Sequence, residues 1–368
     1  MRCEINFEKF KQAVFLTERV AGRHATLPVL SCLLLEIRKT RAILKATNLD
    51  VGIEVELPVK SDGEATLAIP ARTISSFLAQ VSDKEQMVKL ETDSGNLHVS
   101  LSKSKGVIKT VPGEDFPAIP TVSDGKTSVF PSEMLAKGFR SVWYSAAVSN
   151  VKPELASVYV YRDNETAVFA ATDSFRLAEK KVALPKGSHI EDMLIPLKNV
   201  VEIVKLLEAA GPTITMASNK NLVSFEANGM RITSRIIDGV FPDYRQIIPK
   251  GYTTEAIMLK QDLVNTLKVS TVFSDAFNQI HVTIDPKKKA FQIETKNSDV
   301  GENQSSLDAA VTGEPLEINF NGKYISDAFQ AIDADSVSLQ FNGRNKPLVM
   351  RPVSGDQTFL YLVMPMNR

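Results

Sequence analysis

The sequence is poor in the residues from which disulfide scaffolds and metal centres are built. Its 368 residues include two cysteines, Cys3 and Cys32, too few for a disulfide framework in a chain of this length and typical of a reducing compartment. The four histidines lie far apart, and neither a Cys-x-x-Cys nor a His-Glu-x-x-His spacing occurs. We therefore expect no metal site and no metal cofactor.

Long apolar runs are lacking as well. The most apolar stretch, residues 27–35, is interrupted by Pro28 and Ser31 and is too short to span a bilayer. Residues 1–9 mix acidic and basic side chains where a signal peptide requires an uninterrupted apolar segment. The sequence therefore predicts a soluble cytoplasmic protein with no membrane partner.

The chain also has no net charge of either sign. Its 43 Lys and Arg residues balance 43 Asp and Glu residues, whereas domains that hold nucleic acid by bulk electrostatics are usually strongly basic. A nucleic-acid binder of this composition must gather its basic residues on one surface or hold the nucleic acid by its shape. Residues 251–368 carry 14 acidic and 11 basic residues, a small imbalance that fits either random scatter or a negative tail that meets the positive head of another copy.

Two short patterns each return three times along the chain. The first combines three apolar positions with an acidic or polar residue, and the second begins an apolar segment that leads into a basic residue. Successive copies are separated by 125 to 128 residues, and self-similarity at one fixed period is the signature of a repeated structural unit. The first pattern covers residues 5–14, 130–139 and 258–267, and the second covers residues 69–74, 195–200 and 320–325.

Each pattern predicts a short strand that runs into an amphipathic helix. Apolar residues continue at helical spacing over residues 74–81 and 200–207, and Ser132 is expected to cap the helix near residue 135. Each repeat therefore contains two helices. Alternating apolar and polar residues predict half-buried antiparallel strands at residues 96–101, 167–171, 280–284 and 290–295.

The length of the chain predicts two or three domains. The spacing between copies of the two repeated patterns selects three. Segments rich in Pro and Gly near residues 117–125 and 249–252 separate the repeats. The predicted fold class is α+β, with three copies of a unit in which two helices pack on antiparallel sheet. The predicted domains are residues 1–121, 126–249 and 254–368.

Motifs for catalysis are missing from the sequence. No G-x-x-x-x-G-K-[ST] phosphate loop and no dinucleotide fingerprint occur, and Asp173-Ser174 follows a predicted strand without a histidine nearby. Two alternatives to a non-catalytic protein that acts through its shape remain open. One is an enzyme with Asp173 and Arg176 in an interdomain cleft, and the other is a monomeric adaptor that binds DNA or peptides.

Basic residues occur singly on the predicted helices. Arg72, Lys198 and Lys323 occupy equivalent positions at the start of the second helix of each repeat, which fits either a solvated helix face or a common surface toward one polyanion. The C-terminal segment ends with Met364 and Met366 around a proline. Methionine fills core gaps and is also frequent at surfaces that bind several partners.

Several segments together resemble those of a known family over the whole chain. The sequence is similar to the bacterial sliding clamps, the beta subunits of DNA polymerase III. The resemblance implies that two chains join head to tail into a ring of six similar domains, with sheets outside and helices around a hole that encircles duplex DNA. The segments are Thr26–Leu30, Ile69–Arg72, Ala171–Ala178, Asp238–Arg245 and Val363–Met366.

The family also implies a function without catalysis. A sliding clamp tethers the replicative polymerase to DNA as a processivity factor and is opened by an ATP-driven clamp loader, which fits a chain without a phosphate loop of its own. No cofactor is implied. Expected partners are duplex DNA, held without sequence specificity, a second copy of the chain, the polymerase catalytic subunit, the clamp loader and other proteins that carry clamp-binding peptides.

Site residues carried over from the family fall into three sets. For DNA contact they are Arg23, His24, Arg72, Lys152 and Lys198. For a groove that binds partner peptides they are Leu155, Thr172, Arg176, Leu177, Pro242, Ile247, Val363, Met364, Pro365 and Met366, with Asn321 and Tyr324 at its edge. For the joint between two chains they are Phe77, Lys103, Lys105 and Ile108 on the first domain and Val272 and Phe273 on the third, with Asp299 and Glu302 as acidic partners of the two lysines.

The sequence departs from the family in a few of these places. His24 stands where many clamps have arginine, Ser174-Phe175 replaces a Gly-His pair of some clamps, Gln246 stands where an arginine can occur, and Asn367 follows the final methionine.

Overall fold

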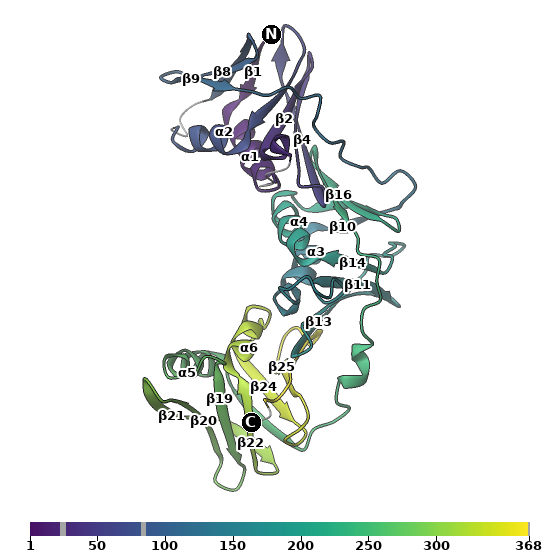
Figure 1. Cartoon of the computed structure of the whole chain (residues 1–368). Coiled ribbons are helices and arrows are strands. Elements are labelled where there is room, and N and C mark those ends of the chain that lie inside the picture. The colour runs from purple at the N-terminus through teal and green to yellow at the C-terminus, as the bar shows by residue number, and fades with distance from the viewer. Residues whose placement is uncertain (23–26, 82–85, 367–368) are drawn as a thin grey trace. The chain divides into compact units, whose positions relative to one another are not determined.

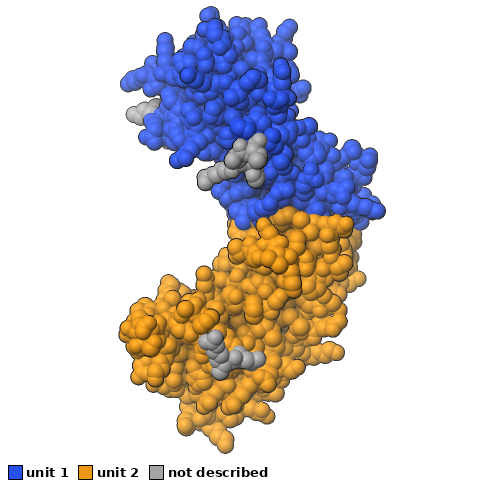
Figure 2. All heavy atoms as spheres, viewed as in Figure 1, with its two compact units in different colours: residues 1–136, 187–191, 198–236 blue, residues 137–186, 192–197, 237–368 orange. Residues whose placement is uncertain are grey.

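The computed structural model describes residues 1–22, 27–81 and 86–366. These residues form two compact units, which Figure 2 shows in different colours. Unit 1 comprises residues 1–136, 187–191 and 198–236, and unit 2 comprises residues 137–186, 192–197 and 237–368. Each unit contains one long and one short antiparallel sheet together with helices (Figure 1), so the predicted α+β class is confirmed.

Unit 1 contains an eight-stranded and a five-stranded sheet. Helices α1 (Phe7–Glu18) and α2 (Ala71–Ala79) belong to this unit, as does most of α4 (Leu197–Ala209), while α3 (Ser132–Arg140) begins in it. The long sheet has the order β10 (Lys126–Pro131), β15 (Thr213–Ser218), β16 (Leu222–Ala227), β17 (Met230–Arg235), β4 (Val51–Pro58), β3 (Arg41–Thr47), β2 (Cys32–Ile37) and β6 (Ala65–Pro70). The short sheet has the order β5 (Lys60–Ser61), β1 (Arg2–Asn6), β7 (Met87–Asp93), β8 (Asn96–Ser100) and β9 (Lys105–Lys109).

Unit 2 contains a nine-stranded and a four-stranded sheet. Its helices are α5 (Lys260–Val272) and α6 (Gly322–Asp327), and α3 ends in it. The long sheet has the order β14 (Met193–Pro196), β11 (Ser157–Asp163), β12 (Thr166–Thr172), β13 (Arg176–Ala183), β26 (Phe359–Val363), β25 (Leu348–Pro352), β24 (Ser336–Phe341), β18 (Thr254–Leu259) and β22 (Ala310–Gly313). The short sheet has the order β21 (Gly301–Leu307), β20 (Ala290–Asn297), β19 (Gln279–Asp285) and β23 (Leu316–Asn321).

The repeated patterns fold as expected. Strands β1, β10 and β18 each run directly into α1, α3 and α5, and strands β6, β14 and β23 each run directly into α2, α4 and α6. Burial alternates along strands such as β19 and β20, as a sheet with one face on the core requires. The four predicted strands coincide with β8, β12, β19 and β20, but β12 is buried on both faces and not half-buried as predicted.

The prediction for Ser132 was wrong. Ser132 is the first residue of α3 and not its cap, and its buried hydroxyl oxygen has no hydrogen-bond partner among the described residues. Its backbone N–H instead donates to the carbonyl of Pro212 at 3.0 Å. The strand that precedes α3 therefore fixes where the helix starts, and a side-chain cap is not needed for that.

Gly138 lets an aromatic ring approach α3 in unit 2. A Cβ atom at residue 138 would lie 2.5 Å from the ring of Phe169, closer than any real side-chain contact. The rings of Phe139 and Phe169 meet edge to face with centroids 4.9 Å apart. A glycine inside a helix is unfavourable by about 1 kcal/mol relative to alanine, and the close ring packing accounts for its presence.

A buried lysine connects β13 to the turn before β26. Lys180 is 2% exposed, and its ammonium group donates to the carboxylate of Asp356 and to Oγ1 of Thr358, the latter at 2.8 Å. Lys137 of α3 also lies 2.8 Å from the Asp356 carboxylate. Burial alone would raise the pKa of Asp356, but the hydrogen bonds from Lys137, Lys180 and Thr358 outweigh it and hold that pKa well below its ordinary value.

Asp356→Asn is expected to destabilise the protein at pH 7 by roughly 2 kcal/mol, because buried Lys180 loses its charged partner. A carboxylate with a depressed pKa in the folded state stabilises the protein above the pKa of the unfolded chain, about 4, and this contribution is lost as the pH falls toward the lower folded value. The variant should therefore lose less stability than the original protein between pH 5 and pH 2. Urea unfolding at several pH values tests this, and parallel pH profiles for the two proteins would contradict it.

Candidate functional site

An apolar groove with a volume of about 150 Å³ lies in unit 2. Its walls come from four parts of the chain: the loop before β11, the β12–β13 hairpin, the segment that precedes residue 248, and the end of β26 with the residues that follow. Most of the lining is apolar, and Arg176 and Asp243 are its charged members. The lining residues are Leu155, Thr172, Ser174, Arg176, Leu177, Pro242, Asp243, Tyr244, Ile247, Leu362 and Met364.

The turn between β12 and β13 is held by its own side chains. Oδ1 of Asp173 accepts the N–H groups of Phe175 and Arg176 at 2.9 and 3.0 Å, and the Thr172 hydroxyl donates to the carbonyl of Arg176 at 2.6 Å. Ser174 adopts a left-handed backbone conformation with φ of 77°, which few side chains tolerate. This tight turn leaves Phe175, which stands between the lining residues Ser174 and Arg176, 61% exposed.

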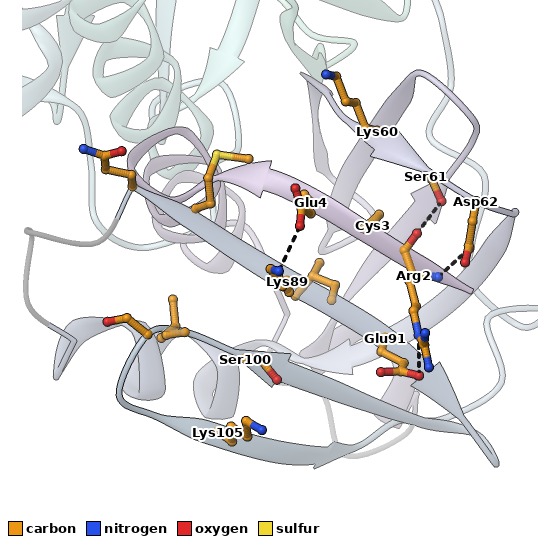
Figure 3. Close-up of a pocket in the computed structure, with 15 residues that line it drawn as sticks. Arg2, Cys3, Glu4, Lys60, Ser61, Asp62, Lys89, Glu91, Ser100 and Lys105 are labelled. Atoms are coloured by element: carbon orange, nitrogen blue, oxygen red, sulfur yellow. Dashed lines mark hydrogen bonds and ion pairs between the residues drawn. The ribbon is translucent and has the colours of Figure 1, made fainter.

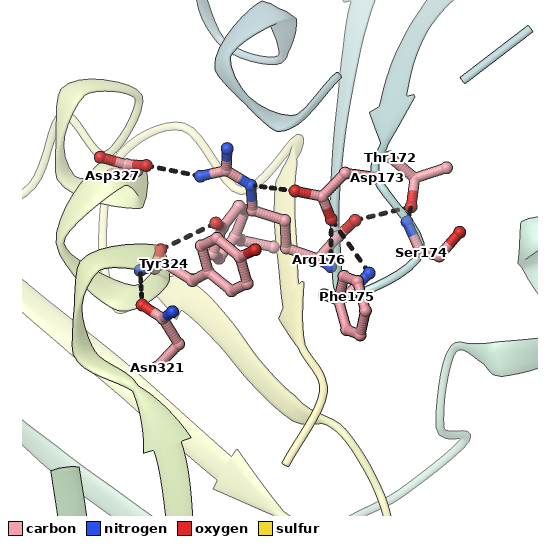
Figure 4. A network of polar contacts seen from close by, with 9 residues as sticks. Thr172, Asp173, Ser174, Phe175, Arg176, Asn321, Tyr324 and Asp327 are labelled. Atoms are coloured by element: carbon pink, nitrogen blue, oxygen red, sulfur yellow. Dashed lines mark hydrogen bonds and ion pairs between the residues drawn. The ribbon is translucent and has the colours of Figure 1, made fainter. Parts of the chain in front are cut away.

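Arg176 forms the charged centre of the wall (Figure 4). Its guanidinium donates through Nε to Asp173 at 2.9 Å and through Nη1 to Asp327 of α6 at 2.5 Å. The same group lies 4.5 Å from the centre of the Tyr324 ring, and its side chain is 10% exposed. Because two carboxylates and an aromatic face surround it, the guanidinium is held in one position.

A second network fixes the part of the lining that contains Tyr244. The Tyr244 hydroxyl donates to Glu179 at 2.5 Å and lies 2.8 Å from the Tyr161 hydroxyl, which accepts from Arg245 at 2.8 Å. Burial and the adjacent Glu179 carboxylate raise the pKa of Tyr244 far above its ordinary value, so its hydroxyl remains a donor at neutral pH. The short helix Tyr244–Ile247 is therefore anchored to the sheet, and this anchorage positions the neighbouring groove residues.

The C-terminal segment closes the groove. The N–H of Met364 donates to the carbonyl of Phe175, and the N–H of Met366 donates to the carbonyl of Asn319, each at 2.8 Å. Met364, Pro365 and Met366 are half-buried, whereas Val363 is fully buried. The tail thus crosses from the β12–β13 turn to β23 and keeps apolar surface at the groove.

The structure brings together most of the residues expected to form the groove. Val363 lies behind the wall in the core, Pro365 and Met366 continue beyond the lining, and Asn321 caps α6 by accepting the N–H of Tyr324 at 3.2 Å. Sequence reasoning missed four lining residues that flank or fall within the segments it singled out: Ser174, Asp243, Tyr244 and Leu362. The lining residues expected from the sequence are Leu155, Thr172, Arg176, Leu177, Pro242, Ile247 and Met364.

A larger hollow of about 1070 Å³ lies over the five-stranded sheet of unit 1 (Figure 3). Four of its charged side chains form ion pairs with one another. Arg2 lies 2.9 Å from Glu91, and Lys89 lies 3.1 Å from Glu4. Because these ion pairs are exposed and the surface offers few apolar anchors, the smaller groove is the better candidate for binding a partner.

The basic residues expected at DNA are placed on separate elements. Arg72 and Lys198 are the second residues of α2 and α4 in unit 1, and Lys323 is the second residue of α6 in unit 2, as their equivalent repeat positions predicted. Lys198 forms an ion pair with Asp50, and Lys152 is exposed in the loop before Leu155. Arg23 and His24 lie outside the described residues.

An aromatic ring from a helix or its C-cap packs near a glycine in each of the edge strands β9 and β21. In unit 1 the Phe77 ring lies 3.2 Å from where a Cβ of Gly106 would be, and in unit 2 the Phe273 ring lies 3.9 Å from the same point on Gly301. Val272, beside Phe273, is 63% exposed. Both sheet edges therefore combine open backbone groups with apolar surface.

The charged residues expected at these edges are exposed, and one apolar residue is not. Lys103 and Lys105 lie at β9 and Asp299 and Glu302 at β21, with Glu302 3.7 Å from Lys296 of its own chain. Ile108 is 6% exposed because its side chain faces the core of its own unit, so it has little surface left for a partner. Val107, which points the other way along β9, is 61% exposed.

The geometry gives no support to an enzyme centred on Asp173 and Arg176. The Asp173 carboxylate accepts two backbone N–H groups and the Arg176 guanidinium, and this leaves it poorly suited to act as a general base. Among the described residues, no group of three His, Cys, Asp or Glu side chains could hold a metal ion. No helix in the described ranges is long and apolar enough to cross a membrane.

Comparison with known proteins gives one family for the whole chain. Three family models, one for each domain of the DNA polymerase III beta subunit, match this chain. The model of the N-terminal domain matches residues 1–120, that of the central domain residues 129–243, and that of the C-terminal domain residues 245–367. The beta sliding clamp of Synechocystis sp. is 26% identical, with 96% of this chain and 95% of that protein covered. The beta sliding clamp of Caulobacter vibrioides is 27% identical, with both chains fully covered.

Solved structures have the same fold. The DNA polymerase III beta subunit of Thermotoga maritima superposes with a TM-score of 0.93 at 23% identity, over 100% of this chain and 99% of that one. The sliding clamp of Pseudomonas aeruginosa bound to griselimycin gives a TM-score of 0.92 at 22% identity, with both chains fully covered.

Proposed function

The chain belongs to the DNA polymerase III beta subunit family, and from this premise we propose how it acts as a sliding clamp. Two copies close into a ring of six domains, residues 1–121, 126–249 and 254–368 of each, around duplex DNA in the cytoplasm. The ring is not an enzyme; it tethers the replicative polymerase and other replication and repair proteins to the DNA. A partner that hydrolyses ATP opens it.

The charge distribution supports holding DNA by topology rather than by a strong grip. The chain has no net charge, and its candidate DNA contacts Arg72, Lys152 and Lys198 are isolated cations, one of them paired with Asp50. Contacts with phosphates carry no sequence information and weaken with salt. A few weak contacts of this kind let the ring slide, whereas many strong ones would stop it.

The two sheet edges support a joint between copies. A heterologous contact between β9 of one copy and β21 of the other closes after two subunits and leaves neither of these two edges open. Phe77, Val272 and Phe273 supply apolar surface there, and Lys103 and Lys105 would meet Asp299 and Glu302. Because such exposed ion pairs contribute little, apolar burial carries most of the stability of this joint.

The groove in unit 2 supports the tethering role, and it is the single observation that carries this part of the proposal. Its apolar lining with a few fixed polar groups is typical of a site for a short anchored peptide. Hydrogen bonds hold each wall before any partner arrives, so binding loses little conformational entropy. Partner proteins would therefore dock through a flexible peptide while the ring moves along DNA.

We expect the protein, once loaded by its clamp loader, to remain on circular DNA through a wash in 1 M salt and to leave when the DNA is linearised. Topological linkage is insensitive to salt, whereas phosphate contacts weaken steeply with it. Gel filtration of labelled protein with nicked plasmid, before and after restriction cleavage, measures this. Equal loss from circular and linear DNA would favour a monomeric adaptor over a ring.

A further inference from the structure

The groove has an excess of negative charge around its apolar lining. Arg176 is the only basic residue among the described residues that line it, and its guanidinium is shared by the carboxylates of Asp173 and Asp327. Asp243 also lines the groove, from the segment before the short helix Tyr244–Ile247. Arg176 and Asp243 are the charged members of the lining, and with the two carboxylates that pair with Arg176 the four side chains carry one positive and three negative charges, although the chain as a whole is neutral.

Asp243 is the carboxylate that remains available to a partner. It is exposed, and it accepts a hydrogen bond from Nε2 of Gln246 at 2.7 Å, which is a neutral donor. Within the described part of the chain, Asp243 forms no ion pair. Arg245, the nearest basic residue in sequence, is occupied elsewhere, because its guanidinium lies over the Tyr161 ring and 3.4 Å from Asp163.

Phe175 provides an independent sign of the same preference. Its ring is 61% exposed, and its backbone is fixed from both sides by Asp173 and by the N–H of Met364. An exposed aromatic face attracts ammonium and guanidinium groups. An exposed aromatic ring and an exposed carboxylate whose described partner is a neutral amide form a surface that suits a cation rather than an anion.

We propose that the peptides bound in this groove carry a lysine or arginine next to their apolar anchor, and that Asp243 and Phe175 select it. This inference rests on the proposed function of the groove and specifies its partner. The apolar residues of the peptide fill the groove, and the cationic side chain lies at its rim, where desolvation is small. An acidic residue at the same position of the peptide would be repelled by the excess carboxylates.

A peptide array tests the proposal with the full-length protein. Labelled hexapeptides carry one of four anchors, Leu-Leu, Leu-Phe, Met-Leu or Phe-Phe, each flanked on either side by Lys, Gln or Glu. We expect the Lys member of the best series to bind roughly five-fold more tightly than its Gln member, with the Glu member weakest, as for one partly solvated charge contact. Fluorescence anisotropy measures this, and the differences should shrink at high salt.

Two variants assign the preference to its residues. Asp243→Asn should reduce the ratio between Lys and Glu peptides, and Phe175→Ala should weaken the Lys peptide more than the Gln peptide. Asp308→Asn, which removes an exposed carboxylate between β21 and β22, is the matched control and should change neither ratio.

The outcomes separate this proposal from the function on which it rests. Equal binding of Lys, Gln and Glu peptides would overturn the charge preference while leaving the groove as a peptide site. If Asp243→Asn left the preference unchanged, the assignment to Asp243 would be wrong. If no member of the array bound, the groove itself would fail as a site for short peptides.

Discussion

Arg176→Ala is expected to lower the free energy of unfolding by about 3 to 5 kcal/mol and to abolish peptide binding. The substitution leaves the carboxylates of Asp173 and Asp327 together in a largely buried place without the cation between them. It also removes a wall of the groove and the packing against the Tyr324 ring. Urea unfolding followed by the fluorescence of Trp143, the only tryptophan and a residue of unit 2, measures the change.

Two further variants test the cause of this loss. Arg176→Ala combined with Asp327→Asn should recover part of the stability, because one of the two uncompensated charges is gone. Arg41→Ala removes an exposed arginine 3.7 Å from Glu56 and should change stability by less than about 1 kcal/mol. An unfolding midpoint for Arg176→Ala equal to that of the Arg41→Ala control would show that the network contributes little.

Phe273→Ala is expected to weaken the association of two chains by about 2 to 4 kcal/mol, or roughly 30- to 1,000-fold in dissociation constant. The ring lies at the C-terminal end of α5 against Gly301 of the edge strand β21, beside exposed Val272. Truncation removes apolar surface at the centre of the proposed joint. Sedimentation velocity over a dilution series should show monomer at concentrations where the original protein is dimeric.

Phe175→Ala is the matched control for this experiment. Both phenylalanines are partly exposed and lie in unit 2, but Phe175 is at the groove and Phe273 is at the sheet edge. Phe175→Ala should weaken peptide binding and leave the dimer intact, and Phe273→Ala should do the reverse. Unchanged sedimentation of Phe273→Ala at low concentration would place the joint elsewhere.

Local order was predictable from the sequence because it depends on neighbours in the chain. Hydrophobic periodicity located the helices and the alternating strands, and a residue such as Arg72 or Lys198 could be assigned to the start of a helix. Helix capping was less accessible. Serine is a residue type that often caps helices, but Ser132 is the first residue inside α3, since the preceding strand β10 determines where this helix begins.

The groove was only partly predictable because its parts are distant in sequence. Arg176 and Asp327 are 151 residues apart, and nothing local to either residue indicates that they meet. The resemblance to sliding clamps supplied most lining residues, yet it did not supply Asp243 or the excess of negative charge. Ile108 was expected at the joint between copies because it is apolar. The pleat of β9 instead turns its side chain toward the core of its own unit, which the residue type alone does not reveal.

The long sheets have a mechanical consequence for a ring that must open. In unit 1, β4 pairs with β17 over residues from the first and second repeats, and in unit 2, β13 pairs with β26 over residues from the second and third. Five residue pairs form each of these ladders, so a force that pulls neighbouring repeats apart must break several hydrogen bonds together. The joint between copies has no covalent chain across it, and we therefore expect it to yield first under load.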